Sequence, residues 1–154
     1  MSVARITAIP SRTDIDSAAE RIAPYVRRTP VIEVDGAEFE IPGVRLFLKL
    51  ELLQHTGSFK ARGAFNRVLS GDVPGVGLLA ASGGNHAQGV AYVARELGYP
   101  AEIFVPASTP SIKVRRLHEL GAHVVQIGDV YDDACRAAEK RAQETGALVV
   151  HAFD

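Results

Sequence analysis

A single lysine stands in a polar and aromatic stretch at residues 54–63, which reads QHTGSFKARG. Lys60 follows Phe59 and is expected in the first turn of a helix, where the positive end of the helix dipole disfavours a cation. The Phe59 ring can cover the lysine stem and exclude water from the amine. Both effects favour the neutral amine that a nucleophilic lysine needs. The other interpretation is a solvated lysine on the protein surface. A phosphate-binding Walker loop is excluded, because the sequence lacks the spacing GxxxxGK[ST].

The second stretch with chemical potential is ASGGNHAQG, at residues 81–89. It lies between a predicted strand and a predicted helix, at the sheet edge where open α/β proteins bind ligands. Two glycines let the backbone approach a ligand, and N–H groups at the start of a helix can hold an anion. An ordinary helix cap is the other interpretation. The pattern is neither GxGxxG nor GxSxG, which disfavours a dinucleotide fingerprint and a hydrolase nucleophile.

Both stretches depend on the elements around them. After residue 77, short apolar segments alternate with helical ones, which predicts an α/β fold with a parallel twisted sheet flanked by helices and right-handed crossovers. The expected strands are 77–81, 101–105, 122–127 and 147–150, and the expected helices include 85–97 and 131–145. A further helix is expected to start at Thr109-Pro110, with the proline in its first turn, and to end at Gly121. Before residue 77 we expect a helix from the caps at 11–14 to Pro24, extended segments at 31–34 and 45–50, and a helix at 58–70 capped by Ser58.

Composition narrows the class of protein. The chain has 154 residues, 47% of them apolar and 23% charged, with a net charge of −1. Such a chain can bury a sizeable core, and it lacks the basic excess of a nucleic-acid-binding domain. We find no apolar run that would span a membrane and no signal peptide. Cys135 is the single cysteine, so no intrachain disulfide is expected. These features predict a cytoplasmic protein.

The remaining polar residues predict no further site. His55 and His118 lack metal-ligand spacing, and Cys135 is expected to be a small core residue, so no metal is expected. The cations at 113–116 fit a solvated helix face. The carboxylates at 129–133 fit the start of a helix, where negative charge is favourable.

Taken together, KLELLQHTGSFKARGA and ASGGNHAQGVA resemble the fold-type II pyridoxal-phosphate enzymes, above all the threonine/serine dehydratases. The similarity continues through PAEIFVPASTPSIKVRRLHELGAHVVQIGDVYDDA and so covers nearly the whole chain. The resemblance implies a tryptophan-synthase-beta-like fold. Residues 1–72 would be the N-terminal arm of the large cofactor domain, and residues 73–154 the small domain with the substrate loop. The family's phosphate loop and its pyridine-nitrogen ligand would lie beyond residue 154, so we expect an N-terminal portion or a truncated gene product.

The resemblance also assigns roles to residues. Lys60 would be catalytic and bind pyridoxal phosphate covalently, Phe59 would lie against the cofactor, and Asn85 would hydrogen-bond an oxygen on its ring. Lys60 would remove the substrate Cα proton, the β-hydroxyl would leave with the cofactor phosphate as acid, and a 2-oxo acid and ammonia would be released. The substrate carboxylate is expected on the backbone N–H groups of the loop that contains Ser82, Gly83, Gly84 and His86.

Several alternatives stay open. The family's serine racemases carry a second serine where this chain has Gly83, which favours elimination over racemisation. A non-catalytic remnant that binds small anions is another hypothesis. A different lyase or synthase of the superfamily, such as cysteine or threonine synthase, is a third, although the SGGNHAQ loop argues against it. The expected partner is a small amino-acid substrate, and we expect the chain to bind neither nucleic acid nor a membrane. The sequence leaves open whether the chain forms a homo-oligomer.

Overall fold

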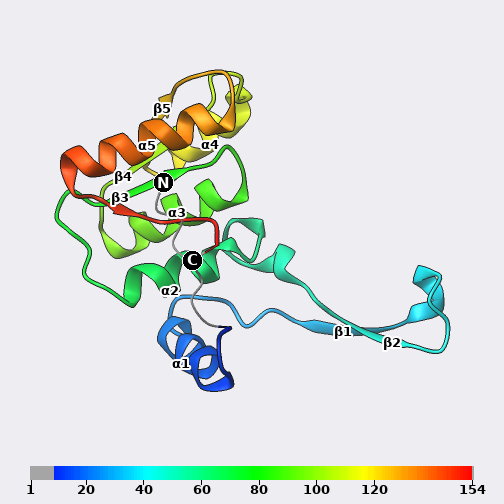
Figure 1. Ribbon diagram of the computed structural model, residues 1–154. Coiled ribbons are helices and arrows are strands. Elements are labelled where there is room, and N and C mark those ends of the chain that lie inside the picture. The colour runs from blue at the N-terminus through cyan, green and yellow to red at the C-terminus, as the bar shows by residue number, and fades with distance from the viewer. Residues whose placement is uncertain (1–8, 154) are drawn as a thin grey trace.

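The computed structural model describes residues 9–153 and contains a parallel sheet with helices on both faces (Figure 1). This confirms the predicted fold class. The sheet order is β5-β4-β3-β6, and every neighbouring pair is parallel. Its strands are β3 (Leu78–Ala81), β4 (Ala101–Val105), β5 (His123–Gln126) and β6 (Leu148–Val149). The helices that connect them are α3 (Asn85–Leu97), α4 (Ser111–Glu119) and α5 (Tyr131–Thr145).

Side chains alternate between the two faces of the sheet, and each face has its own core. Leu78 and Ile103 pack into the larger cluster with residues of α3 and α4. Leu79 and Phe104, their neighbours in sequence, pack against Ala134 of α5 on the opposite face. Because side chains alternate with a period of two residues, α5 covers one face of the sheet and α3 and α4 cover the other.

The ends of α3, β4 and α5 fall where the sequence predicts them. Gly98 and Gly146 follow the two helices in the left-handed conformation, which glycine adopts without steric cost. The proline expected in the first turn of α4 instead lies one position earlier. Pro110 is the cap residue, with an extended ψ of 137°, and α4 begins at Ser111.

Two further helices cover the larger core. In α1 (Arg12–Ile22), Ser11 and Asp14 form the reciprocal hydrogen bonds of a capping box, as the caps in the sequence predict. α2 (Lys60–Leu69) packs along α3 and contributes the fully buried Phe65. No helix among residues 9–153 is long and apolar enough to cross a membrane.

The prediction that Ser58 caps α2 is wrong. The helix begins at Lys60, and Phe59 occupies the cap position without a side-chain cap bond. Ser58 precedes it in extended conformation, and its hydroxyl is buried with no hydrogen-bond partner. An N-cap side chain must reach the N–H two or three residues ahead, and the added residue Phe59 removes Ser58 from that position.

An antiparallel hairpin extends from the body of the molecule (Figure 1). It consists of β1 (Val31–Asp35) and β2 (Arg45–Lys49), linked through the 3-10 turn η1 (Gly36–Phe39). One face carries only aliphatic side chains, and Phe47 on the other face is 62% exposed. The exposed Phe47, beside the partly buried Leu46 and Leu48, gives the hairpin apolar surface that favours association of chains. The aliphatic face consists of Ile32, Val34, Leu46 and Leu48.

Candidate active site

The two motifs meet where α2 and α3 cross. Gly89 lies in the second turn of α3, and a Cβ atom built on it would stand 3.1 Å from the carbonyl carbon of Lys60 and 3.2 Å from the Ala61 nitrogen. Glycine is needed because both contacts are backbone atoms that have little freedom to move. The last glycine of SGGNHAQG thus lets the lysine-bearing end of α2 approach the start of α3.

The Lys60 amine has two neighbours. Its Nζ donates a hydrogen bond of 2.7 Å to the backbone carbonyl of Ala152. It also lies 5.0 Å from the centre of the Phe59 ring, within the range of a cation–π contact. Phe59 is 58% exposed, so part of its surface is open to a ligand. The contact places the ring against the amine; that Phe59 covers the lysine stem stays a prediction.

The loop between β3 and α3 supplies backbone N–H groups at the carboxyl edge of the sheet. Ser82 Oγ accepts a hydrogen bond of 3.2 Å from the Gly84 N–H, so this serine shapes the turn. Asn85 is exposed at the first position of α3, and the next residue, His86, is buried. The His86 Nε2 atom lies 2.9 Å from the Val150 carbonyl, and since a carbonyl only accepts, Nε2 carries the hydrogen.

A charged cluster holds the segment before Lys60 in place. Arg62 donates two hydrogen bonds to Glu51, of 2.7 and 2.8 Å, and a third of 3.0 Å to the Arg27 carbonyl. Thr29 donates a further hydrogen bond, of 2.5 Å, to Glu51. These bonds, led by those from Arg62, lower the pKa of Glu51 to about 2. The cluster ties α2 to η2 (Glu51–Leu53) and to the chain that enters β1.

Gln54 and His55 complete this support. The Gln54 side chain, buried, accepts from the Arg27 N–H and donates to the Arg27 carbonyl, at 3.0 and 2.9 Å. His55, in η3 (His55–Gly57), stacks on Tyr92 of α3, and its Nδ1 lies 3.0 Å from the Tyr92 hydroxyl. Burial lowers the pKa of His55 and raises the pKa of Tyr92, so both rings favour the neutral form.

In the residues that precede Lys60, the hydroxyls of Thr56 and Ser58 are buried and have no hydrogen-bond partner. Thr56 also has a φ of 60°, which is unfavourable for a β-branched residue. A buried, unsatisfied hydroxyl costs about 1–3 kcal/mol. Strain and unpaired polar atoms in the residues before Lys60 are features typical of a functional site.

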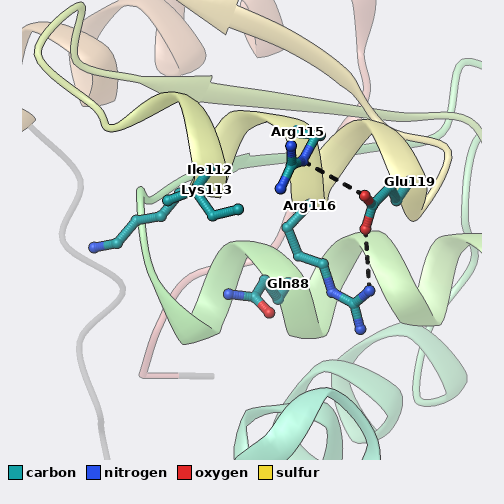
Figure 2. A pocket seen from close by; sticks show the side chains of 6 residues that line it. All are labelled: Gln88, Ile112, Lys113, Arg115, Arg116 and Glu119. Carbon is teal, nitrogen blue, oxygen red and sulfur yellow. Dashed lines mark hydrogen bonds and ion pairs between the residues drawn. The ribbon is translucent and has the colours of Figure 1, made fainter.

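A basic groove of about 230 Å³ lies apart from Lys60, between α3 and α4 (Figure 2). Arg115 and Arg116 reach Glu119 at 3.8 and 3.2 Å, whereas Lys113 points away from it. These exposed, paired cations agree with the predicted solvated helix face. Within the part of the chain that the structure describes, no group of His, Cys, Asp and Glu has the arrangement of a metal site.

Replacing Gly89 by alanine is expected to lower the free energy of unfolding by about 1 kcal/mol, because overpacking against the Lys60 backbone exceeds the gain in helix propensity. Urea unfolding measures the effect. Gly75→Ala is the control, since a Cβ atom at Gly75 has no neighbour within 4 Å. If the Gly89→Ala protein were more stable than wild type, the starts of α2 and α3 would be able to move apart at little cost in free energy.

The structure thus brings Lys60, Phe59 and the start of α3 together, and it adds residues that the motifs do not reveal. Arg62 lies inside the SFKARG motif, which is a local signal of its role. Glu51 and Gln54 also lie inside the motif KLELLQHTGSFKARGA, although Gln54 binds the distant Arg27. Val150 contacts His86 from 64 positions away, and no local pattern indicates this contact.

Comparisons with known proteins agree with this fold. The model of the family described as "Pyridoxal-phosphate dependent enzyme" matches residues 22–154. L-Threonine ammonia-lyase of Thermotoga maritima is 41% identical over 143 residues, which are 92% of this chain and 35% of that protein. The crystal structure of a threonine deaminase from T.th. has a TM-score of 0.81 at 44% identity, covering 94% of this chain and 46% of the other. Maize serine racemase has a TM-score of 0.80 at 36% identity, covering 89% and 42%.

The chain therefore spans about a third of the length of its curated relative and less than half of either solved chain. The matched segment nevertheless contains both motifs, the lysine at the start of α2 and the loop at the start of α3. With a family model that covers most of its residues, this chain belongs to the pyridoxal-phosphate-dependent enzymes.

Proposed function

We propose that this chain provides the lysine and the substrate loop for pyridoxal-phosphate-dependent β-elimination of L-threonine or L-serine, which yields a 2-oxo acid and ammonia. The observation that carries the proposal is the close packing of Lys60 against the α3 motif at Gly89. Relatives named L-threonine ammonia-lyase support the choice of reaction. We propose residues 1–72 as the arm of the large domain and residues 73–154 as the small domain.

The residues present fit one side of the cofactor. Lys60 offers an amine 5.0 Å from the centre of the exposed Phe59 ring, and two buried hydroxyls in the residues just before it in sequence lack partners. The cofactor, when bound, supplies a carbonyl carbon for the lysine and an electron sink for the substrate Cα. Asn85, exposed at the start of α3, is proposed to donate to an oxygen on the cofactor ring. The ligands of the cofactor phosphate are not assigned to residues of this chain.

Each proposed role follows from a position in the fold. The Nζ atom of Lys60 would take the Cα proton and would pass it on before the free amine displaces the product. Backbone N–H groups at the start of α3 bind the substrate carboxylate, aided by the positive end of the helix dipole. The loop that supplies them contains Ser82, Gly83, Gly84 and His86.

Elimination fits the loop better than racemisation does. Racemisation through two bases needs a second base on the face of the substrate opposite Lys60. Gly83 has no side chain, and a Cβ atom at this position would stand 3.3 Å from Thr109 Oγ1. The loop therefore leaves little room for a serine there. We also propose a cytoplasmic location, supported by the single cysteine, and leave homo-oligomer formation open.

The purified 154-residue chain with pyridoxal phosphate tests the proposal. We expect a visible absorbance band that Lys60→Ala removes and Lys113→Ala retains. Borohydride followed by mass spectrometry is expected to place the pyridoxyl group on Lys60, and threonine and serine are then assayed for 2-oxo acid. The opposite result would be the absence of any absorbance band that depends on Lys60, with the pyridoxyl group spread equally over the four lysines Lys49, Lys60, Lys113 and Lys140. That result would favour a remnant without catalytic activity.

A further inference from the structure

The chain that leaves β6 lies across both motifs. β6 pairs in parallel with β3, so its carboxyl end emerges beside the loop that leads into α3. From there the red C-terminal segment continues to the start of α2 (Figure 1). Val150 is buried and its N–H donates to the Leu79 carbonyl at 2.9 Å, which fixes where this segment begins.

The carbonyls of this segment bind the functional side chains of both motifs. His86 donates to the Val150 carbonyl, and Lys60 donates to the Ala152 carbonyl two residues further on. The segment 150–152, here called the strap, therefore connects the two helix starts through its backbone. Since His86 is only 7% exposed, water is poorly placed to replace the strap as the partner of its N–H.

We propose that His86 is a positioning residue, which holds the strap so that the Ala152 carbonyl restrains the Lys60 amine until a ligand displaces it. This inference rests on the proposed function of Lys60, but it assigns the His86 side chain a task separate from substrate binding. The hydrogen bond to Ala152 fixes the direction of Nζ and covers one side of it. Reaction of the amine with any electrophile then requires that bond to break.

Competitive acetylation with acetic anhydride measures this restraint without cofactor. The amine nitrogen bonds to an acetyl carbon, acetate leaves, and the amine proton passes to solvent. The rate at Lys60 is divided by the rate at the exposed Lys140 of the same molecule. We expect His86→Phe to raise this ratio about threefold to tenfold, the effect of losing one hydrogen bond. His86→Gln keeps an N–H donor and is expected to stay near wild type, and His118→Phe is the matched control.

A reciprocal experiment covers the case in which His86→Phe fails to fold, as circular dichroism would reveal. Lys60→Met removes the donor to Ala152 and is expected to accelerate hydrogen exchange at the amides of residues 151–153, whereas Lys113→Met leaves that exchange unchanged. An acetylation ratio that a folded His86→Phe protein keeps at the wild-type value would overturn the proposal. The proposal would also be overturned if Lys60→Met leaves hydrogen exchange at the amides of residues 151–153 unaltered. Neither readout involves turnover or cofactor, so both remain informative if the elimination activity is not found.

Discussion

Replacing Phe65 by alanine is expected to lower the free energy of unfolding by about 4 kcal/mol, the usual cost of emptying a fully buried aromatic site. Phe65 has no exposed surface, stacks on Tyr25 with ring centres 5.2 Å apart, and meets Tyr92 edge to face at 6.1 Å. Its loss leaves a cavity between α2 and α3, because a helix pair held by many other contacts collapses only in part.

Urea unfolding followed by circular dichroism measures this change, and Phe47→Ala is the matched control. Phe47 is 62% exposed on the hairpin, so its loss is expected to change the free energy of unfolding by less than about 0.5 kcal/mol. Equal losses in the two variants would mean that the α2–α3 contact does not contribute to the cooperative core.

Removing Arg62 is expected to be nearly as costly. The Glu51 side chain is only 17% exposed and takes two hydrogen bonds from Arg62. Arg62→Ala leaves this carboxylate without its main partner, and we expect a loss of about 3 kcal/mol. Arg62→Lys keeps the charge but not the paired geometry and is expected to fall between Arg62→Ala and wild type.

Arg12→Ala is the control for a surface pair. Arg12 also contacts a carboxylate, that of Asp16, but its side chain is 87% exposed. We expect a loss of less than about 0.5 kcal/mol there. A comparable loss in Arg12→Ala and Arg62→Ala would contradict the claim that burial sets the strength of the Glu51 cluster.

The pH dependence of stability tests the same cluster. The pKa of Glu51 is about 2 in the folded chain, against an ordinary value of 4.5. A lowered folded pKa contributes stability that is complete above the ordinary value and is lost as the pH falls toward 2. The difference in the free energy of unfolding between wild type and Glu51→Gln is therefore expected to be constant from pH 7 to about 5 and to shrink toward pH 2. A difference that stays constant over the whole range would show that ionised Glu51 is not stabilised by Arg62.

Local signals predict those elements whose ends are set by local chemistry. Gly98 and Gly146 end α3 and α5 because the left-handed conformation after a helix suits glycine, and the pattern of Ser11 and Asp14 marks the start of α1. The alternation of strands and helices after residue 77 predicts parallel strands, because each helix provides the crossover connection that two parallel strands need.

The remaining features depend on tertiary contacts that no short window contains. Ser58 has the composition of a cap, yet tertiary packing buries its hydroxyl and shifts the helix start to Lys60. The pairing of β1 with β2 spans an irregular segment and a 3-10 turn that carry no hairpin signal. Likewise, neither motif indicates that Lys60 donates to the carbonyl of Ala152.

The bond between Lys60 and Ala152 joins residues 92 positions apart, and the one between His86 and Val150 joins residues 64 apart. Contacts of such separation form late in folding, because a long loop must close first. The packing of α2 (Lys60–Leu69) on α3 (Asn85–Leu97) joins residues that are closer in sequence than these pairs. During synthesis from the N-terminus, we therefore expect α2 to dock on α3 while the Lys60 amine is still exposed to solvent. The amine gains its hydrogen bond only after the segment that contains Ala152 has left the ribosome.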